Sequence, residues 1–140
     1  MAKGMEVMTV MSLRILIVDD SPAMRAYVRR TLQMAGLPVS SVYEAGNGQE
    51  ALEVVARENK PENKLSLIFT DINMPVMNGE ELVTKLQAED SSKEIPILVI
   101  STDSTKKRVF RLRELGARGY IAKPCAPEMI RLKVEQVVGV

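Results

Sequence analysis

The sequence predicts an α/β protein, a doubly wound parallel sheet of five strands with five helices packed on both faces. Two observations lead to this prediction. Short runs of Ile, Val and Leu alternate five times with amphipathic stretches of helical spacing, as in parallel sheets joined by crossover helices. The apolar runs also lack a polar residue at every second position, as expected for strands that are buried on both faces.

Five apolar runs are the predicted strands, and the second of them is the weakest. All are short, which fits strands better than buried helices. In chain order they are Leu13–Val18, Val39–Tyr43, Leu65–Phe69, Ile97–Ile100 and Tyr120–Ala122.

The stretches between these runs place apolar residues on one stripe of a helix. The first has the clearest end signals: Ser21 is the expected cap, Pro22 occupies the first helical position, and Gly36 follows the last turn. Ser104 is the expected cap of the fourth helix. The predicted helices are Pro22–Ala35, Gln49–Arg57, Glu80–Ala88, Ser104–Leu115 and Pro127–Val138.

Length and composition agree with one domain. The chain has 140 residues, of which 46% are apolar and 26% charged, and a domain of this size buries a sufficient core without disulfides. We assign residues 12–138 to this domain. Residues 1–11 lack the long apolar core of a signal peptide, and we interpret them as a flexible N-terminal extension.

Composition also excludes several functions. The absence of histidine excludes a Ser/His/Asp triad and the usual zinc sites. Cys125 is the only cysteine, so no internal disulfide forms, which favours a reducing compartment. The net charge of +1 does not suggest nucleic-acid binding, and no apolar run approaches the ~18 residues of a membrane span. We therefore expect a cytoplasmic protein that binds neither nucleic acid nor membrane.

Polar side chains follow four of the five predicted strands. The carboxyl ends of parallel strands share one edge of the sheet, and ligands of open α/β sheets bind there. We therefore expect carboxylates, hydroxyls and one ammonium to meet at this edge. They are Asp19 and Asp20 after the first strand, Asp71 after the third, Ser101 and Thr102 after the fourth, and Lys123 after the fifth.

Each of these residues has an ordinary explanation when it is taken alone. Asp19 and Asp20 could favour the start of the following helix, and Lys123 could be a solvated surface residue. Their coincidence at four strand ends favours a common site. Three clustered carboxylates require a positive partner, and an oxygen-rich site suits Mg²⁺. Beside the metal and Lys123, the Asp71 carboxylate could attack phosphorus and form an aspartyl phosphate.

The segments Ile15–Pro22, Asp71–Pro75, Ile97–Ser101 and Gly119–Pro124 resemble the receiver domain of two-component response regulators, especially single-domain chemotaxis regulators. The resemblance extends from about Leu13 to Val138. It implies a flavodoxin-like fold with sheet order 2-1-3-4-5. It also implies a phosphorylation-dependent switch that receives its phosphoryl group from a partner histidine kinase or a small phosphodonor.

The resemblance implies a role for each site residue. Asp71 would be the phosphoacceptor, and Lys123 would pair with the phosphoryl oxygens. Asp20 would bind Mg²⁺ directly, Asp19 would assist partly through water, and Asn73 would offer its backbone carbonyl to the metal.

The resemblance further implies how the signal leaves the site. Ser101 would shift toward the phosphoryl group, Tyr120 would turn inward, and the Lys123–Pro124 bond would be cis. The fourth helix, fifth strand and fifth helix would bind an effector protein, and the protein would be a monomer that could dimerise on activation. Tyr120 could instead be a half-buried aromatic residue without a switching role.

Three features stand apart from this pattern. Thr102 occupies a position where the family usually has Ala or Gly, and its branched side chain is expected to narrow access to the phosphoryl site. Cys125 could be reactive, although packing is the simpler explanation. A basic patch could be a solvated helix face or a docking surface for an acidic partner; it consists of Lys106, Lys107, Arg108, Arg111, Arg113 and Arg118.

Two other functions use similar residues. A phosphatase of the haloacid-dehalogenase type also has an aspartate nucleophile at a strand end, but it needs an acid two positions later, where this chain has Asn73. A binding module that has lost phosphorylation would be expected to lack part of the cluster that Asp19, Asp20, Asp71 and Lys123 complete.

Overall fold

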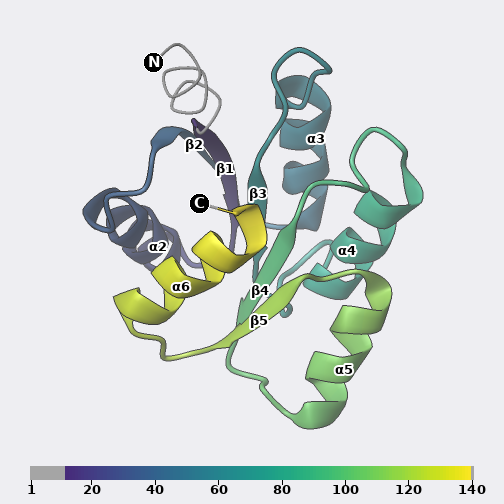
Figure 1. Ribbon diagram of the computed structural model, residues 1–140. Coiled ribbons are helices and arrows are strands. Elements are labelled where there is room, and N and C mark those ends of the chain that lie inside the picture. Colours follow the sequence, from purple (N-terminus) through teal and green to yellow (C-terminus); the bar gives the residue numbers. More distant parts are fainter. Residues whose placement is uncertain (1–11, 140) are drawn as a thin grey trace.

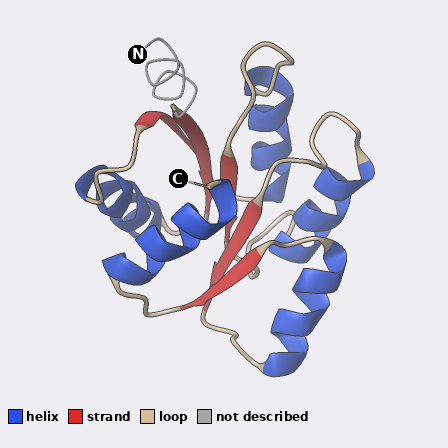
Figure 2. Ribbon diagram, in the orientation of Figure 1, coloured by secondary structure: helices blue, strands red, loops and turns tan. Residues whose placement is uncertain are grey.

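The computed structural model describes residues 12–139, which form one parallel five-stranded sheet flanked by helices (Figures 1 and 2). The strand order is β2-β1-β3-β4-β5, which confirms the predicted fold and sheet order. The predicted extension at residues 1–11 lies outside the described part of the chain. The strands are β1 (Leu13–Val18), β2 (Val39–Ala45), β3 (Leu67–Thr70), β4 (Ile97–Ser101) and β5 (Gly119–Ala122).

Five helices connect the strands and cover both faces of the sheet. Figure 1 shows α2 and α6 on one face and α3, α4 and α5 on the other. None of the helices within residues 12–139 has the length and apolar character of a membrane-spanning segment. The helices are α2 (Pro22–Met34), α3 (Gly48–Glu58), α4 (Gly79–Ala88), α5 (Lys106–Leu115) and α6 (Pro127–Val138).

The core is divided between the two faces of the sheet. Along β1, Ile15 and Ile17 pack with α2 and α6, whereas Leu16 and Val18 pack with α3 and α4. Side chains of a strand point alternately to opposite faces, so a strand that is covered on both sides carries apolar residues on both faces. Arg14 is the only polar residue of β1. All six residues of β1 are buried, and each fully buried Ile or Leu contributes about 1.5–3 kcal/mol to stability.

Element boundaries differ from the predicted ones where side chains from elsewhere decide them. Strand β2 continues to Ala45, which pairs with Val18. Ser104 was predicted to cap α5, and this prediction is wrong. The Thr105 side chain instead accepts a hydrogen bond from the Arg108 backbone N–H, and the helix begins one residue later. Thr105 itself is fixed because its N–H and hydroxyl both donate to the Asp103 carboxylate.

The loop after β3 folds back, so that Gly79 at the start of α4 lies against Asp71 and Ile72, which directly follow β3. Helix α4 begins with a capping box in which the side chains of Asn78 and Glu81 each accept from the other residue's backbone N–H. Gly79 lies so close to β3 that a Cβ atom there would be 2.2 Å from the Asp71 carbonyl oxygen. Only glycine permits this approach, and the contact fixes the start of α4 against Asp71.

Candidate functional site: an acidic cluster with one lysine

Three carboxylates meet at the carboxyl edge of the sheet. Asp19 and Asp20 follow β1 and Asp71 follows β3, and one oxygen of each lies within 4.8 Å of the others. The two strand ends are joined because the Asp71 N–H donates to the Val18 carbonyl at 3.0 Å. Asp19 is buried, whereas Asp20 is exposed to solvent. The structure thus brings together three acids that the sequence places at two different strand ends.

Lys123 completes the cluster from the end of β5. Its Nζ atom lies 3.0 Å from the Asp19 carboxylate and 3.0 Å from the Asp71 carboxylate. Its backbone N–H donates to the Ser101 carbonyl at 2.8 Å, which anchors the lysine to β4. Lys123 is therefore a bridging cation at the site and not a solvated surface residue. The bond from Lys123 to Pro124 is cis, as the resemblance implied.

The surroundings raise the pKa of two of these groups. Burial raises the pKa of Asp19, and hydrogen bonds from the Ser21 N–H and from Lys123 only partly oppose it. Burial acts to lower the pKa of Lys123, but hydrogen bonds to Asp19 and Asp71 outweigh it and raise that pKa above its usual value. Lys123 is therefore a firmly protonated partner for the acids.

The Asp71 carboxylate is held in a defined orientation. Its Oδ1 atom accepts a hydrogen bond from the Ile72 N–H at 2.7 Å, and its Oδ2 atom faces Lys123. Its side chain is 12% exposed, so a small part of the carboxylate remains open to solvent. A carboxylate that is oriented by hydrogen bonds and partly open to solvent can act as a nucleophile.

The donor set at this edge fits a magnesium ion. Three carboxylates and one ammonium leave two negative charges unmatched, which equals the charge of Mg²⁺. Mg²⁺ prefers a few carboxylate ligands and retains several waters, and the exposed Asp20 leaves the cluster open on the solvent side. Asn73 is exposed in the loop after β3, and its backbone carbonyl remains a predicted ligand.

Ser101 is the last residue of β4, and Tyr120 lies on the neighbouring strand β5, opposite Val99. Ser101 is fully buried, and its hydroxyl accepts a hydrogen bond from the Asp103 N–H at 3.3 Å. The Tyr120 hydroxyl donates to the Asp103 carbonyl, and Tyr120 packs against the buried cluster that includes Val99 and Leu112. Burial raises the pKa of Tyr120, so the phenol is a hydrogen-bond donor at neutral pH.

Two arginines near the site were not predicted to belong to it. Arg25 donates to the Asp19 carbonyl at 2.5 Å and to Glu44 at 2.8 Å. Arg108, part of the predicted basic patch, pairs with both Glu80 and Asp103. The alternation of strands and helices carries no signal for these contacts, although the position of Asp103 two residues after Ser101 is a hint.

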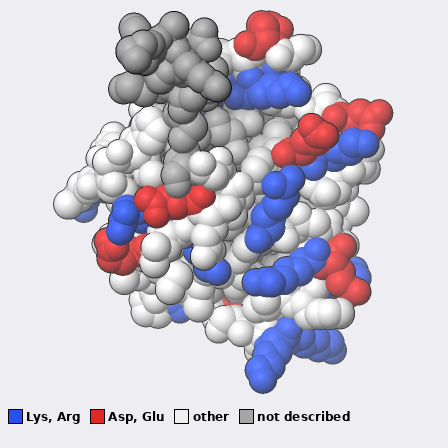
Figure 3. All heavy atoms as spheres, in the orientation of Figure 1, with Lys and Arg blue, Asp and Glu red and all other residues white. Residues whose placement is uncertain are grey.

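The basic patch is partly neutralised. Besides Arg108, Arg111 also lies near Glu80, at 3.6 Å. Figure 3 shows Lys and Arg side chains next to Asp and Glu over much of the side where α4 and α5 lie, with Lys and Arg alone at the lower end of α5. The solvated helix face thus accounts for only part of the patch.

Known proteins share both the sequence pattern and the fold. The chain is 39% identical over 127 residues to the chemotaxis protein CheY1 of Helicobacter pylori, covering 91% of this chain and 98% of that protein. It is 35% identical over 127 residues to a CheY homologue of Campylobacter jejuni, covering 91% and 93%. The structure of CheY4 of Vibrio cholerae superposes with a TM-score of 0.75 at 32% identity, covering 90% and 98%.

A family model covers nearly all of the described chain. The model of the response regulator receiver domain matches residues 15–135, a range that includes Asp19, Asp20, Asp71, Ser101 and Lys123. The acidic cluster, the parallel sheet and these relatives lead to the same conclusion: the chain belongs to the response regulator receiver domain family.

Proposed function

We propose that this protein is a phosphorylation-dependent signalling switch that accepts a phosphoryl group on Asp71. The observation that carries the proposal is the contact between the Asp71 carboxylate and Lys123 beside two further carboxylates. The donor would be a phosphohistidine of a sensor kinase, since this chain has no histidine, or a small phosphodonor.

The transfer step follows from this arrangement. An oxygen of the Asp71 carboxylate forms a bond to phosphorus while the bond from phosphorus to the donor atom breaks. The electron pair of that bond leaves with the donor, which takes up a proton from solvent. Lys123 stabilises the negative oxygens during transfer. A bound Mg²⁺, held by Asp19, Asp20, Asp71 and the Asn73 carbonyl, would supply further positive charge to these oxygens.

The signal would be carried by a change in protein binding. Phosphorylation makes the charge at Asp71 more negative, at about −2, and adds strong acceptor oxygens. The Ser101 hydroxyl and Lys123 can bind these oxygens. This differential binding favours one conformation of the nearby loops. An effector would then bind the surface of α5, β5 and α6, where Met129 and Leu132 of α6 are exposed. The chemotaxis proteins among its relatives favour a role in chemotaxis.

The test is mass measurement after incubation with Mg²⁺ and acetyl phosphate. The wild type is expected to gain one phosphoryl group, and Asp71→Asn is expected to gain none. Asp90→Asn is a matched control, because Asp90 is exposed after the end of α4 and is not one of the three clustered acids. This variant should gain one phosphoryl group, as the wild type does.

Two results would replace the proposal. Steady release of phosphate from a small phosphomonoester would indicate a phosphatase, although Asn73 stands where the required second acid would be. Failure of the wild type to label with acetyl phosphate or with any kinase would indicate a binding module that does not use phosphorylation.

A further inference from the structure

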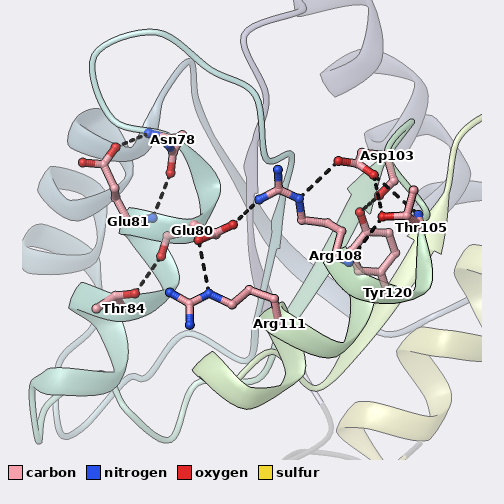
Figure 4. Close-up of polar contacts among 9 residues, drawn as sticks. All are labelled: Asn78, Glu80, Glu81, Thr84, Asp103, Thr105, Arg108, Arg111 and Tyr120. Carbon is pink, nitrogen blue, oxygen red and sulfur yellow. Dashed lines mark hydrogen bonds and ion pairs between the residues drawn. The ribbon is translucent and has the colours of Figure 1, made fainter.

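Arg108 links two parts of the chain that flank the site. Its guanidinium pairs with Glu80 at the start of α4 and, at 3.2 Å, with Asp103 in the loop after β4 (Figure 4). The three side chains are only 25–33% exposed. Arg108 thus connects the loop that follows Ser101 to the start of α4, the helix that follows Asp71 in the chain.

Asp103 is the point at which this link reaches Tyr120. The Asp103 carbonyl accepts from the Tyr120 hydroxyl, and its N–H donates to the Ser101 hydroxyl. Its carboxylate accepts from Thr105 as well as from Arg108. Partial burial acts to raise the pKa of Asp103, but the hydrogen bonds from Arg108 and Thr105 lower it, so the carboxylate that Arg108 holds is ionised at neutral pH.

Glu80 is the point at which the link reaches Asp71. It follows Gly79, whose backbone is pressed against the Asp71 carbonyl. Glu80 is also paired with Arg111 at 3.6 Å, and its carbonyl accepts from the Thr84 hydroxyl at 2.9 Å. A displacement of the loop after Asp71 would therefore move the carboxylate that binds Arg108.

These contacts form a continuous path between Asp71 and Tyr120 that does not pass through the Ser101 hydroxyl. In order, its members are Asp71, Gly79, Glu80, Arg108, Asp103 and Tyr120. The guanidinium is a planar fork whose N–H donors have fixed directions, whereas a lysine ammonium is a point charge on a flexible stem. Such a fork transmits position as well as charge.

We propose that Arg108 is a positioning residue that couples the loop after Asp71 to the conformation of Tyr120. By fixing Asp103, it favours the arrangement in which the Tyr120 hydroxyl binds the Asp103 carbonyl. Its consequence for signalling rests on the function proposed above, whereas the coupling itself exists in the unphosphorylated protein.

The first test measures Tyr120 directly, without phosphodonor or Mg²⁺. The three tyrosines are labelled as 3-fluorotyrosine, and their ¹⁹F resonances are assigned with Tyr→Phe variants. In Arg108→Gln, the ratio of bound to released Tyr120 is expected to fall by about three- to tenfold, the loss expected for two partly exposed ion pairs. Arg108→Lys keeps the charge but loses the fork, and its ratio of bound to released Tyr120 is expected to fall similarly. An unchanged Tyr120 resonance in Arg108→Gln would overturn the proposal.

Two controls separate positioning from a general effect on folding. Arg113→Gln makes the same charge change on the same helix at an exposed residue that forms no ion pair among residues 12–139, and its Tyr120 resonance should match the wild type. The resonances of Tyr27 and Tyr43 should stay unchanged in every variant. Full restoration of the Tyr120 signal by Arg108→Lys would mean that charge alone matters, and would overturn the role of the fork.

A double-mutant cycle tests whether the path continues to α4. Glu80→Gln is expected to shift the Tyr120 ratio in the wild-type background and to add little in the Arg108→Gln background. Independent, additive effects would place Glu80 outside the path and would overturn the coupling to the Asp71 loop.

A last measurement separates this inference from the proposed function. With acetyl phosphate and Mg²⁺, Arg108→Gln is expected to label on Asp71 but to change the phosphoryl lifetime by about the same factor as the Tyr120 ratio. If no protein labels, including the wild type, the proposed function fails while the Tyr120 result still decides the coupling. If the wild type and variant share one lifetime despite a shifted Tyr120 ratio, the link does not extend to Asp71.

Discussion

Gly79 shows how a residue without chemistry of its own can fix the proposed phosphoacceptor, Asp71. In Gly79→Ala, the added Cβ would lie 2.2 Å from the Asp71 carbonyl and 2.9 Å from the Ile72 Cα atom, both backbone atoms that yield little. We expect a loss of about 1–3 kcal/mol in the free energy of unfolding, the usual effect of overpacking, and slower phosphoryl labelling. Urea unfolding and labelling rates measure the two effects.

Gly46→Ala is the matched control for this change. Its added Cβ would lie 3.4 Å from the flexible Glu50 side chain, so stability and labelling should stay near wild type. Equal losses in the two variants would mean that glycine itself, and not the approach to Asp71, determines the effect.

Thr102 tests how the residue beside Ser101 controls access to the site. The Thr102 side chain is exposed in the loop after β4, and its branched Cβ is expected to hinder water near the phosphoryl group. We therefore expect Thr102→Ala to shorten the phosphoryl lifetime several-fold, measured as loss of label from isolated phosphoprotein. Ser104→Ala, exposed in the same loop, should not change it. An unaltered lifetime and donor range in Thr102→Ala would contradict the prediction.

The principal site residues could be predicted because strand ends determine their location. Asp19, Asp71 and Lys123 each follow a buried run directly, and the common edge of a parallel sheet brings them together whatever their side chains do. Arg25 and Arg108 could not be predicted in this way, because their roles depend on the direction of long side chains across the space between elements. That direction follows from packing and has no period in the sequence.

At the scale of elements, Glu44 joins strand β2 to helix α2. Its carboxylate accepts from Arg25 at 2.8 Å and from Arg29 at 2.7 Å. Partial burial acts to raise the pKa of Glu44, but hydrogen bonds from the two arginines outweigh it and lower the pKa below its usual value. A lowered pKa in the folded state means that this contribution to stability is present above the unfolded-state pKa and is lost as pH falls through the folded-state pKa.

Glu44→Gln should therefore reduce stability in a pH-dependent way. We expect a loss of about 1 kcal/mol in the free energy of unfolding at pH 7, which disappears in acid, where Glu44 is protonated in the wild type as well. Urea unfolding at several pH values measures it. Glu53→Gln, at an exposed residue of α3 that forms no ion pair within the described range, should show no such dependence, and a loss that is constant with pH would contradict the assignment.

The limits of α5 show why element boundaries are harder to predict than elements. Ser104 and Thr105 are both suitable caps by type. Asp103 decides between them, because its carboxylate binds the Thr105 N–H and hydroxyl while Arg108 holds its other oxygen. The start of the helix is therefore set by contacts of Asp103, in the preceding loop, with Thr105 and with Arg108 of α5. No local sequence pattern specifies these contacts.

At the scale of the whole molecule, the alternation of strands and helices predicted the parallel sheet, but not the order of its strands. Order depends on which buried runs pair, and all five runs are similar in composition. Resemblance to the family supplied the order 2-1-3-4-5, and the structure confirms it. The order matters because it places β1, the source of two acids, between β2 and β3 and directly beside the strand that carries Asp71.

The charge of the assembled edge leads to a prediction for the whole molecule. Asp19, Asp20 and Asp71 converge on a single ammonium, so the folded state concentrates negative charge that the unfolded chain disperses. Magnesium binding to the folded state alone should stabilise it by mass action, by about 2.7 kcal/mol when Mg²⁺ is present at a hundred times its dissociation constant. For a domain of this size, that raises the midpoint of thermal unfolding by several degrees.

Asp20→Asn should remove most of this stabilisation, because it removes the exposed carboxylate of the three that could bind the ion. Asp90→Asn changes charge equally at a side chain that is 96% exposed and pairs with Lys93, and it should retain the full magnesium response. The measurement compares thermal midpoints with MgCl₂ and with NaCl at equal ionic strength, so that screening of charge cancels. If Asp20→Asn and the wild type gain equal stability from magnesium, the ion binds elsewhere, and the three acids do not form its site.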